Sequence, residues 1–248
     1  MKKQMLVQIA ELKEKIAQYR PLSPSEVQRL REEFIIESTY NSNAIEGNTI
    51  TLRETVLILK EGMTIAEKPI REHLDIIGFK DAFNYIYELV ANNEPLTERT
   101  IKDIHSLVLM SNAENRGVYR KIPVRILGAE NEPTPPYLIA EEMATLIAKY
   151  QQKLTACHPL EAIAWLHLAF ESIHPFIDGN GRAGRLLLNF ELLKQGYLPV
   201  DIKFTDRVKY YSYFDEFHRN NQDPTALLEL IADYELQELE RYLHILER

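Results

Sequence analysis

The segment from His174 to Arg185 combines residue types suited to holding a nucleotide polyphosphate beside a proton acceptor. It reads His-Pro-Phe-Ile-Asp-Gly-Asn-Gly-Arg-Ala-Gly-Arg and is followed by an apolar run with helical spacing. A glycine-rich turn that leads into a helix directs free backbone N–H groups, and the positive end of the helix dipole, at one point. The segment therefore predicts an anion site next to a histidine that can exchange a proton near neutral pH.

The side chains of this turn suit that chemistry individually. Gly179 and Gly181 allow the backbone to approach a ligand closely. Arg182 and Arg185 lie three residues apart on one side of the first helical turn, where both guanidinium groups can reach the same phosphate chain. Asp178 suits Mg²⁺, which binds one or two carboxylates together with phosphate oxygens and water.

The same segment resembles the signature of the Fic family, His-Pro-Phe-x-Asp/Glu-Gly-Asn-Gly-Arg-x-x-Arg, at every fixed position. Members of that family typically transfer AMP from ATP to a hydroxyl side chain of a protein and release pyrophosphate. The resemblance implies an ATP-dependent nucleotidyltransferase that modifies Ser, Thr or Tyr of a target protein or of itself, with His174 as the catalytic base. The implied ATP- and phosphate-binding residues are Asp178, Gly179, Asn180, Gly181, Arg182, Ala183, Gly184 and Arg185, and Asp178 also holds Mg²⁺.

A second motif, Ser42-Asn43-Ala44-Ile45-Glu46-Gly47, ends a helix that we expect over about 24–47. Ser42 and Glu46 are four residues apart and share a face of this helix. A glutamate in the last turn meets the negative end of the helix dipole, which favours a cationic partner elsewhere. From these residues alone, an exposed glutamate before a helix-ending glycine, Gly47, is the alternative interpretation.

Ser-x-x-x-Glu-Gly also resembles the inhibitory motif Ser/Thr-x-x-x-Glu-Gly/Asn, which lies on a helix beside the Fic site. The resemblance implies that Glu46 pairs with Arg185 and holds it away from the γ-phosphate. ATP would then bind in a posture unsuited to transfer. Because the motif precedes the core in the chain, the resemblance places the protein in the N-terminally inhibited class.

Residues 117–136 interrupt the helical pattern and predict a β-hairpin, because apolar residues alternate there and prolines follow a Gly-containing turn. A plain surface hairpin is one interpretation. The segment also resembles the Fic flap, which covers the nucleotide and aligns the target segment by strand addition. By position, the flap residues at the nucleotide are Ile126, Leu127, Gly128 and Ala129.

A segment near the C-terminus, Arg207-Val208-Lys209-Tyr210-Tyr211, resembles the Arg-x-x-Tyr-Tyr of the family beside the adenine. An aromatic face can stack on a base, so Tyr210 and Tyr211 are expected adenine contacts, although helix packing explains either tyrosine equally well. His218 stands where family members often have an asparagine, and it is the third expected contact.

Helical periodicity dominates the chain and predicts an all-α fold, a Fic-type helical bundle with a β-hairpin flap over the active site. We expect three parts: an N-terminal helical segment over 1–62, a Fic core over 63–222 and a C-terminal helix over 223–248. The expected helices cover about 5–19, 24–46, 51–62, 70–90, 98–110, 139–154, 160–173, 182–194, 206–220 and 225–246.

Composition narrows the class of protein. The net charge of −8 over 248 residues argues against a general nucleic-acid surface. A single cysteine excludes an internal disulfide. Because the sequence offers neither a membrane-spanning run nor a secretory signal, we expect a cytoplasmic protein without membrane contact. The helix over 5–19 offers an interface for a homo-oligomer.

Three other functions stay open at this point. The same loop can remove AMP from a protein, with Glu46 orienting water, or use a different nucleotide. A second is a helical protein-interaction module whose site is permanently shut. The third is a helical nucleic-acid regulator, which the acidic charge disfavours.

Overall fold

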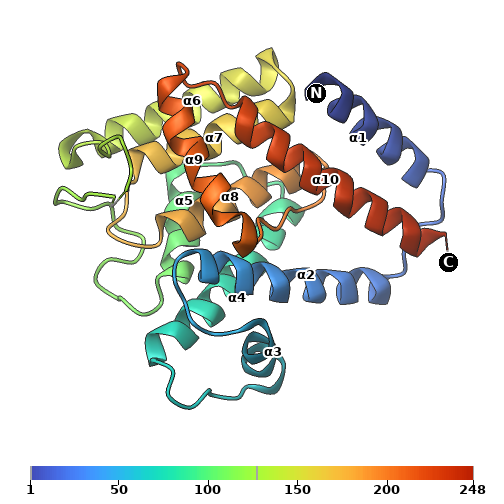
Figure 1. Cartoon of the computed structure of the whole chain (residues 1–248), viewed down its shortest axis with the longest axis horizontal. Helices are drawn as coiled ribbons and strands as arrows, with labels where there is room; N and C mark the ends of the chain where they lie inside the picture. Colours follow the sequence, from blue (N-terminus) through green and yellow to red (C-terminus); the bar gives the residue numbers. More distant parts are fainter. Residues whose placement is uncertain (1, 127, 248) are drawn as a thin grey trace.

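The computed structural model describes residues 2–126 and 128–247, and in these ranges the chain forms a bundle of α-helices (Figure 1). The predicted all-α fold is confirmed. The helices are α1 (Lys2–Ile16), α2 (Pro24–Ile45), α3 (Leu52–Glu61), α4 (Ile70–Ala91), α5 (Glu98–Val108), α6 (Ile139–Ala156), α7 (Pro159–Ile173), α8 (Asn180–Lys194), α9 (Arg207–Arg219) and α10 (Thr225–Leu246), with short 3-10 helices η1 (Pro136–Leu138) and η2 (Phe204–Asp206).

Local sequence signals account for both ends of α3 and for the start of α2. The Ser23 hydroxyl accepts a hydrogen bond from the N–H of Glu26, whose carboxylate accepts one from the N–H of Ser23. Thr51 and Glu54 form the same capping box at α3, which Gly62 ends in the left-handed conformation. Helix ends elsewhere lie within about three residues of those expected from periodicity.

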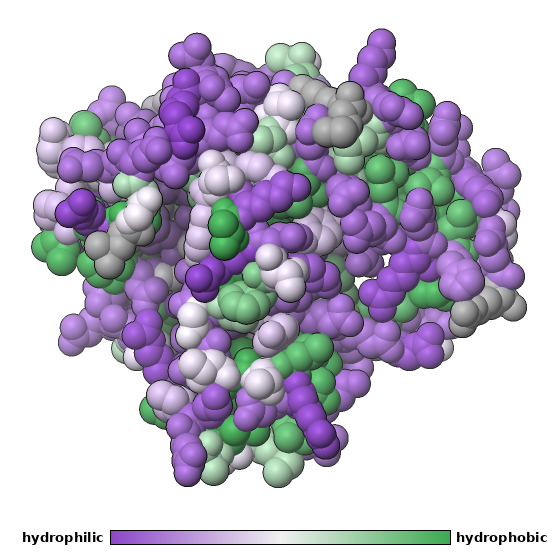
Figure 2. All heavy atoms as spheres, viewed as in Figure 1, coloured by the Kyte–Doolittle hydropathy of each residue, from purple (hydrophilic) through white to green (hydrophobic). Residues whose placement is uncertain are grey.

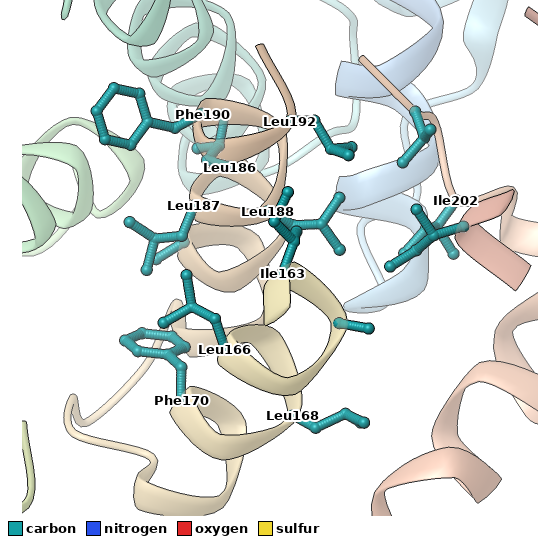
Figure 3. Close-up of a cluster of buried hydrophobic side chains, with 14 of the residues drawn as sticks. Ile163, Leu166, Leu168, Phe170, Leu186, Leu187, Leu188, Phe190, Leu192 and Ile202 are labelled. Carbon is teal, nitrogen blue, oxygen red and sulfur yellow. The ribbon is translucent and has the colours of Figure 1, made fainter. Parts of the chain in front are cut away.

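The two helices that carry the His174–Arg185 motif form the centre of the hydrophobic core. α7 and α8 pack directly on each other, and their apolar side chains interlock (Figure 3). Each fully buried side chain of this kind contributes about 1.5–3 kcal/mol, so the motif lies between two firmly packed helices. The labelled members of the cluster are Ile163, Leu166, Leu168 and Phe170 of α7, Leu186, Leu187, Leu188, Phe190 and Leu192 of α8, and Ile202.

The helix that carries Ser42 and Glu46 belongs to the body of the molecule. The C-terminal half of α2 is buried, and α2 packs on α3, α4 and α8. α1 instead lies along α10, so elements from the two ends of the chain are neighbours (Figure 1). The expected division into segments 1–62, 63–222 and 223–248 stays a prediction.

The β-hairpin expected over 117–136 is wrong. In the described residues of this range, which we call the flap segment, the backbone forms turns and extended stretches without strand pairing. Its prolines lack the N–H groups that a ladder needs. The buried guanidinium of Arg120 holds the segment instead, by donating hydrogen bonds to the carbonyls of Ile122, Thr134 and His174.

The surface is mainly hydrophilic on the face shown in Figure 2, where apolar side chains form small separate groups. Within residues 2–126 and 128–247, every helix is too short or too polar to cross a membrane.

We expect Arg120→Lys to loosen the flap segment, because one ammonium group cannot serve three separate carbonyls as the planar guanidinium does. Hydrogen exchange should become about tenfold faster or more at the amides of 121–134. Arg125→Lys, at an exposed position of the same segment, is the matched control and should leave these rates unchanged. Equal rates in the two variants would contradict the anchoring role of Arg120.

Candidate active site

His174 ends α7 in the left-handed conformation, with φ 50° and ψ 59°. This conformation is uncommon outside glycine and is held here from both sides. The His174 N–H donates to the carbonyl of Phe170 at 3.0 Å, and the His174 carbonyl accepts from Arg120 Nε at 2.8 Å. Its imidazole lines a cavity of about 480 Å³. Burial lowers the pKa of His174 to about 4, so the ring is neutral at pH 7, as a general base must be.

The Gly-Asn-Gly turn forms the first turn of α8, which begins two residues earlier than expected. Gly179 is the N-terminal cap of the helix, and its positive φ of 77° explains the glycine. The Asn180 side chain accepts from the N–H of Phe176 and donates to the carbonyl of Phe176, both at 2.9 Å. The N-terminus of α8 thereby reaches the cavity at Gly181, where an anion is expected.

His105 on α5 holds this turn through a hydrogen bond to its backbone and a ring stack. The N–H of Gly117 donates to its Nδ1 at 2.9 Å, so the ring carries its proton on Nε2, which donates to the carbonyl of Asp178 at 2.8 Å. The ring stacks on Phe176 with centroids 3.6 Å apart, and Phe176 itself is fully buried. Sequence analysis missed His105, although a histidine on an otherwise apolar helix face is a usable signal.

The guanidinium of Arg185, which is 4% exposed, is engaged by the end of α2. Its Nε donates to the Ser42 hydroxyl at 2.9 Å, and its Nη2 donates to the Ser42 carbonyl at 2.9 Å. Nη2 also donates to Glu46 Oε1 at 2.7 Å. The contact between Glu46 and Arg185 that the inhibitory-motif resemblance implied is therefore present.

The Glu46 carboxylate also lies against the N-terminus of α8. A Cβ atom added at Gly181 would collide with Glu46 Oε1. Glu46 thus occupies the place where a helix N-terminus and a guanidinium together favour an anion. Gly47, with φ 91°, follows it and turns the chain away from α2.

Whereas Arg185 pairs with Glu46, Arg182 pairs with the carboxylates of Asp75 and Asp178. Its Nη1 lies 2.6 Å from Asp75 Oδ1 on α4, and its Nη2 lies 3.5 Å from Asp178 Oδ1. The side chains of Arg182 and Asp75 are only 3% and 10% exposed. That Arg182 and Arg185 reach one phosphate chain stays a prediction for the nucleotide-bound protein. Sequence analysis missed Asp75, because its partner is over a hundred residues away.

Asp178 presents a carboxylate beside the turn, with 42% of its side chain exposed. Oδ1 accepts from the Gly179 N–H and Oδ2 from Arg71 Nη2, both at 2.6 Å. Clusters of three or more His, Cys, Asp or Glu able to hold a metal by themselves are absent from the described part of the chain. An exposed carboxylate beside a phosphate site still fits Mg²⁺, which keeps several waters and takes other ligands from phosphates.

The remaining residues of the motif shape the site from within the core. Ala183 is fully buried in α8. A Cβ atom at Gly184 would collide with Glu171 Oε1, so the carboxyl of Glu171 on α7 requires the glycine. Glu171 lines the cavity and was also missed by sequence analysis, although a glutamate three residues before His174 on an apolar helix is unusual.

Two further walls complete the cavity. The flap segment contributes Ile126, Gly128 and Ala129, while Leu127 lies outside the described residues. α9 contributes the three residues expected at the adenine: Tyr210, Tyr211 and His218.

These three α9 residues differ in their exposure and in their hydrogen-bond partners. Tyr210 is 1% exposed and its hydroxyl hydrogen-bonds His167 Nε2 at 2.7 Å, so it packs the core as well as lining the cavity. Tyr211 is 41% exposed and donates to the carbonyl of Ile45 at 3.2 Å. His218 Nε2 lies 3.0 Å from Ser172 Oγ. Their role as adenine contacts stays a prediction, which Tyr211 fits best.

The fold and the site together define a class: a helical-bundle protein with a neutral histidine and an arginine-bearing helix N-terminus on one cavity. A volume of about 480 Å³ lies within the usual range of small-molecule sites. Residues 95–192 match the Fic/DOC family.

Sequence similarity to known proteins extends beyond residues 95–192 and covers most of the chain. The chain is 33% identical over 246 residues to a protein adenylyltransferase Fic of Nematostella vectensis, covering 97% of this chain and 56% of that protein. It is 34% identical over 227 residues to one from Drosophila persimilis, covering 89% and 43%. The chain thus spans about half the length of these curated relatives.

Solved structures give the same result. A Fic-domain-containing signaling protein from Bacteroides thetaiotaomicron superposes with a TM-score of 0.88 at 26% identity, covering 97% of each chain. Fic-1 (residues 134–508) from C. elegans superposes with a TM-score of 0.85 at 28% identity, covering 99% of this chain and 73% of that one. Residues 95–192 thus carry the Fic/DOC family match, and the fold resembles that of Fic-domain proteins along nearly the whole chain.

We expect Asp75→Asn to lower the free energy of unfolding by about 3 kcal/mol, because it leaves the buried charge of Arg182 without its closest balance. Urea unfolding followed by circular dichroism measures this. Asp81→Asn removes a carboxylate from a surface pair with Lys80 and should cost about 0–1 kcal/mol. Similar losses in both variants would show that the Asp75–Arg182 pair is not the stabilising contact that its burial suggests.

Proposed function

We propose that this chain is a protein adenylyltransferase, which transfers AMP from ATP to a Ser, Thr or Tyr hydroxyl of a protein. The observation that carries the proposal is that the imidazole of His174, whose pKa burial lowers, lies on the same cavity as Arg185 and the N-terminus of α8. The relatives named protein adenylyltransferase Fic support the same activity. They are about twice as long as this chain, so the activity is proposed from the site and the family together.

The reaction begins when the target hydroxyl attacks the α-phosphorus of ATP. His174 accepts the hydroxyl proton, an O–P bond forms to AMP, and pyrophosphate leaves. General-base help of this kind contributes about 10²–10⁴-fold. The N-terminus of α8 and the two guanidinium groups of Arg182 and Arg185 offset the charge on the departing pyrophosphate.

Asp178 is the residue that would hold Mg²⁺, and the ion when bound would neutralise phosphate charge. Arg71 Nη2 donates a hydrogen bond to one oxygen of this carboxylate. The base of the nucleotide would lie between the flap segment and α9. There the exposed ring of Tyr211 offers a stacking surface that is worth about 1–3 kcal/mol.

The pairing of Arg185 with Glu46 favours an inhibited resting form. The Glu46 carboxylate takes both the guanidinium and the helix N-terminus that a terminal phosphate would use. Ser42 holds the same guanidinium through its hydroxyl and its carbonyl. A coupling free energy of about 1–3 kcal/mol would reduce transfer roughly 5–150-fold.

Removal of AMP from a modified protein is the second candidate, because Glu46 lines the same cavity as His174 and is 34% exposed. A carboxylate in that place can orient a water for attack on the phosphodiester. Incubation with an AMP-modified protein and no ATP tests this activity, and released AMP would favour it. The cytoplasmic location and any homo-oligomer stay predictions.

We expect Glu46→Gly to raise AMP transfer roughly 5–150-fold, because it frees Arg185 for the terminal phosphate. The measurement is label transferred from ATP marked at the α-phosphate, with cell lysate as the protein source and mass spectrometry of the products. Glu46→Gln keeps the volume but not the charge, and should give an intermediate rise. A folded Glu46→Gly variant with unchanged or lower transfer would remove the inhibitory role.

His174→Ala in the Glu46→Gly background should abolish transfer while leaving ATP affinity within about threefold, because the imidazole takes the proton and does not hold the phosphates. Transfer and the Kd for ATP are measured on the same preparation. Label transferred from γ-marked ATP would indicate phosphoryl transfer instead. Retained AMP transfer by the double variant would exclude His174 as the base.

A further inference from the structure

A buried carboxyl that the mechanism above does not use lies beside the base. Glu171 is on α7, its side chain is 10% exposed, and it lines the cavity. Its Oε1 is buried without a hydrogen-bond partner among the described residues and packs against Gly184. A buried polar atom without a partner is costly, of the order of 1–3 kcal/mol, so this carboxyl calls for a functional explanation.

One candidate partner is the imidazole of His174, which forms a long contact with this carboxyl. Glu171 Oε2 lies 3.9 Å from His174 Nδ1. Nδ1 is buried and makes no well-directed hydrogen bond in the described chain, although the main-chain carbonyl of Glu171 is close enough to raise the pKa of the ring. The two groups lie three residues apart, where α7 ends. A small rotation of either side chain would bring them to a hydrogen-bond distance of about 2.7–3.0 Å.

The protonation state of the carboxyl then decides which ring nitrogen of His174 carries the proton. An ionised Glu171 accepts a hydrogen bond from Nδ1–H, which leaves Nε2 free to take the proton of the target hydroxyl. A protonated Glu171 donates to Nδ1, which leaves the ring proton on Nε2 and makes the ring unable to act as a base there. A neighbouring carboxylate sets the tautomer of a catalytic histidine in the same way in hydrolase triads.

We propose that Glu171 is a positioning residue that sets the tautomer of His174 and permits AMP transfer when ionised. This inference rests on the adenylyl transfer proposed above.

Glu46 would influence this tautomer, because its charge raises the pKa of Glu171. Burial raises the pKa of Glu171 to about 8, the guanidinium of Arg185 lowers it, and the carboxylate of Glu46 raises it. Withdrawal of Glu46 removes a charge that keeps Glu171 protonated, so Glu46 would restrain both Arg185 and the base. The titratable and charged groups around Glu171 and His174 are Glu46 of α2, Arg120 of the flap segment, His167 of α7, Asp178 of the turn, Arg185 of α8, and Tyr210 and Tyr211 of α9.

The first test is the pH dependence of AMP transfer by Glu46→Gly between about pH 6 and pH 9 at saturating ATP. The rate should rise with pH, about tenfold per unit, and level off above the pKa of Glu171. The ring of His174 titrates below this window, because burial lowers its pKa to about 4. The chain with Glu46 intact should show the same rise at higher pH.

Glu171→Gln in the Glu46→Gly background should give a flat profile, because the amide does not titrate. Glu235→Gln is the matched control: Glu235 is a fully buried carboxyl of α10 whose pKa burial raises to about 7, and it accepts from the N–H of Leu198. The control should keep the rise. A rise that persists in the Glu171→Gln variant would overturn the inference.

The second test needs neither activity nor a variant. Ring-nitrogen NMR shifts of His174 in the nucleotide-free chain should show a proton on Nε2 at about pH 6 and on Nδ1 at about pH 9. A ring that keeps one tautomer throughout would overturn the role of Glu171. A tautomer change in a Glu46→Gly chain that transfers no AMP would overturn the proposed function instead.

Discussion

The buried guanidinium of Arg185 is the constraint on which the rest of the site depends. A charge that is 4% exposed must be balanced, because an uncompensated buried charge costs about 3–5 kcal/mol. Glu46 provides the opposite charge in this structure and Ser42 accepts two further hydrogen bonds, and phosphate oxygens would provide the charge in the proposed nucleotide complex. Under the proposed function, α2, which packs on α8, and the phosphates of ATP would compete for the Arg185 guanidinium.

Burial shifts the pKa values of the neighbouring Glu171 and His174 side chains in opposite directions. Burial lowers the pKa of His174, which favours the uncharged ring that the proposed role as proton acceptor requires, and it raises the pKa of Glu171, which favours the protonated carboxyl. Arg120 contributes indirectly, since it holds both the His174 carbonyl and the flap segment. Arg120 thus fixes both the flap segment, which forms one wall of the cavity, and the backbone of His174.

The sequence predicted features that depend on local spacing and missed those that depend on tertiary contact. Capping residues such as Ser23 and Thr51 act over three residues, so the helix starts they mark are visible in the sequence. The hairpin prediction was wrong because side-chain hydrogen bonds from Arg120 replace strand pairing. Asp75 and Arg71 meet the motif only through the packing of α4 on α8, and no local pattern carries that information.

The position of Glu46 at the very end of α2 determines what its release requires. Ser42 and the buried half of the helix are locked into the body, whereas Glu46 is the capping residue, followed by a glycine with nothing packed where a side chain would be. Terminal turns fray far more readily than whole helices move. Under the proposed inhibition, a partner that unwinds this single turn at the surface would free Arg185 without disturbing the core.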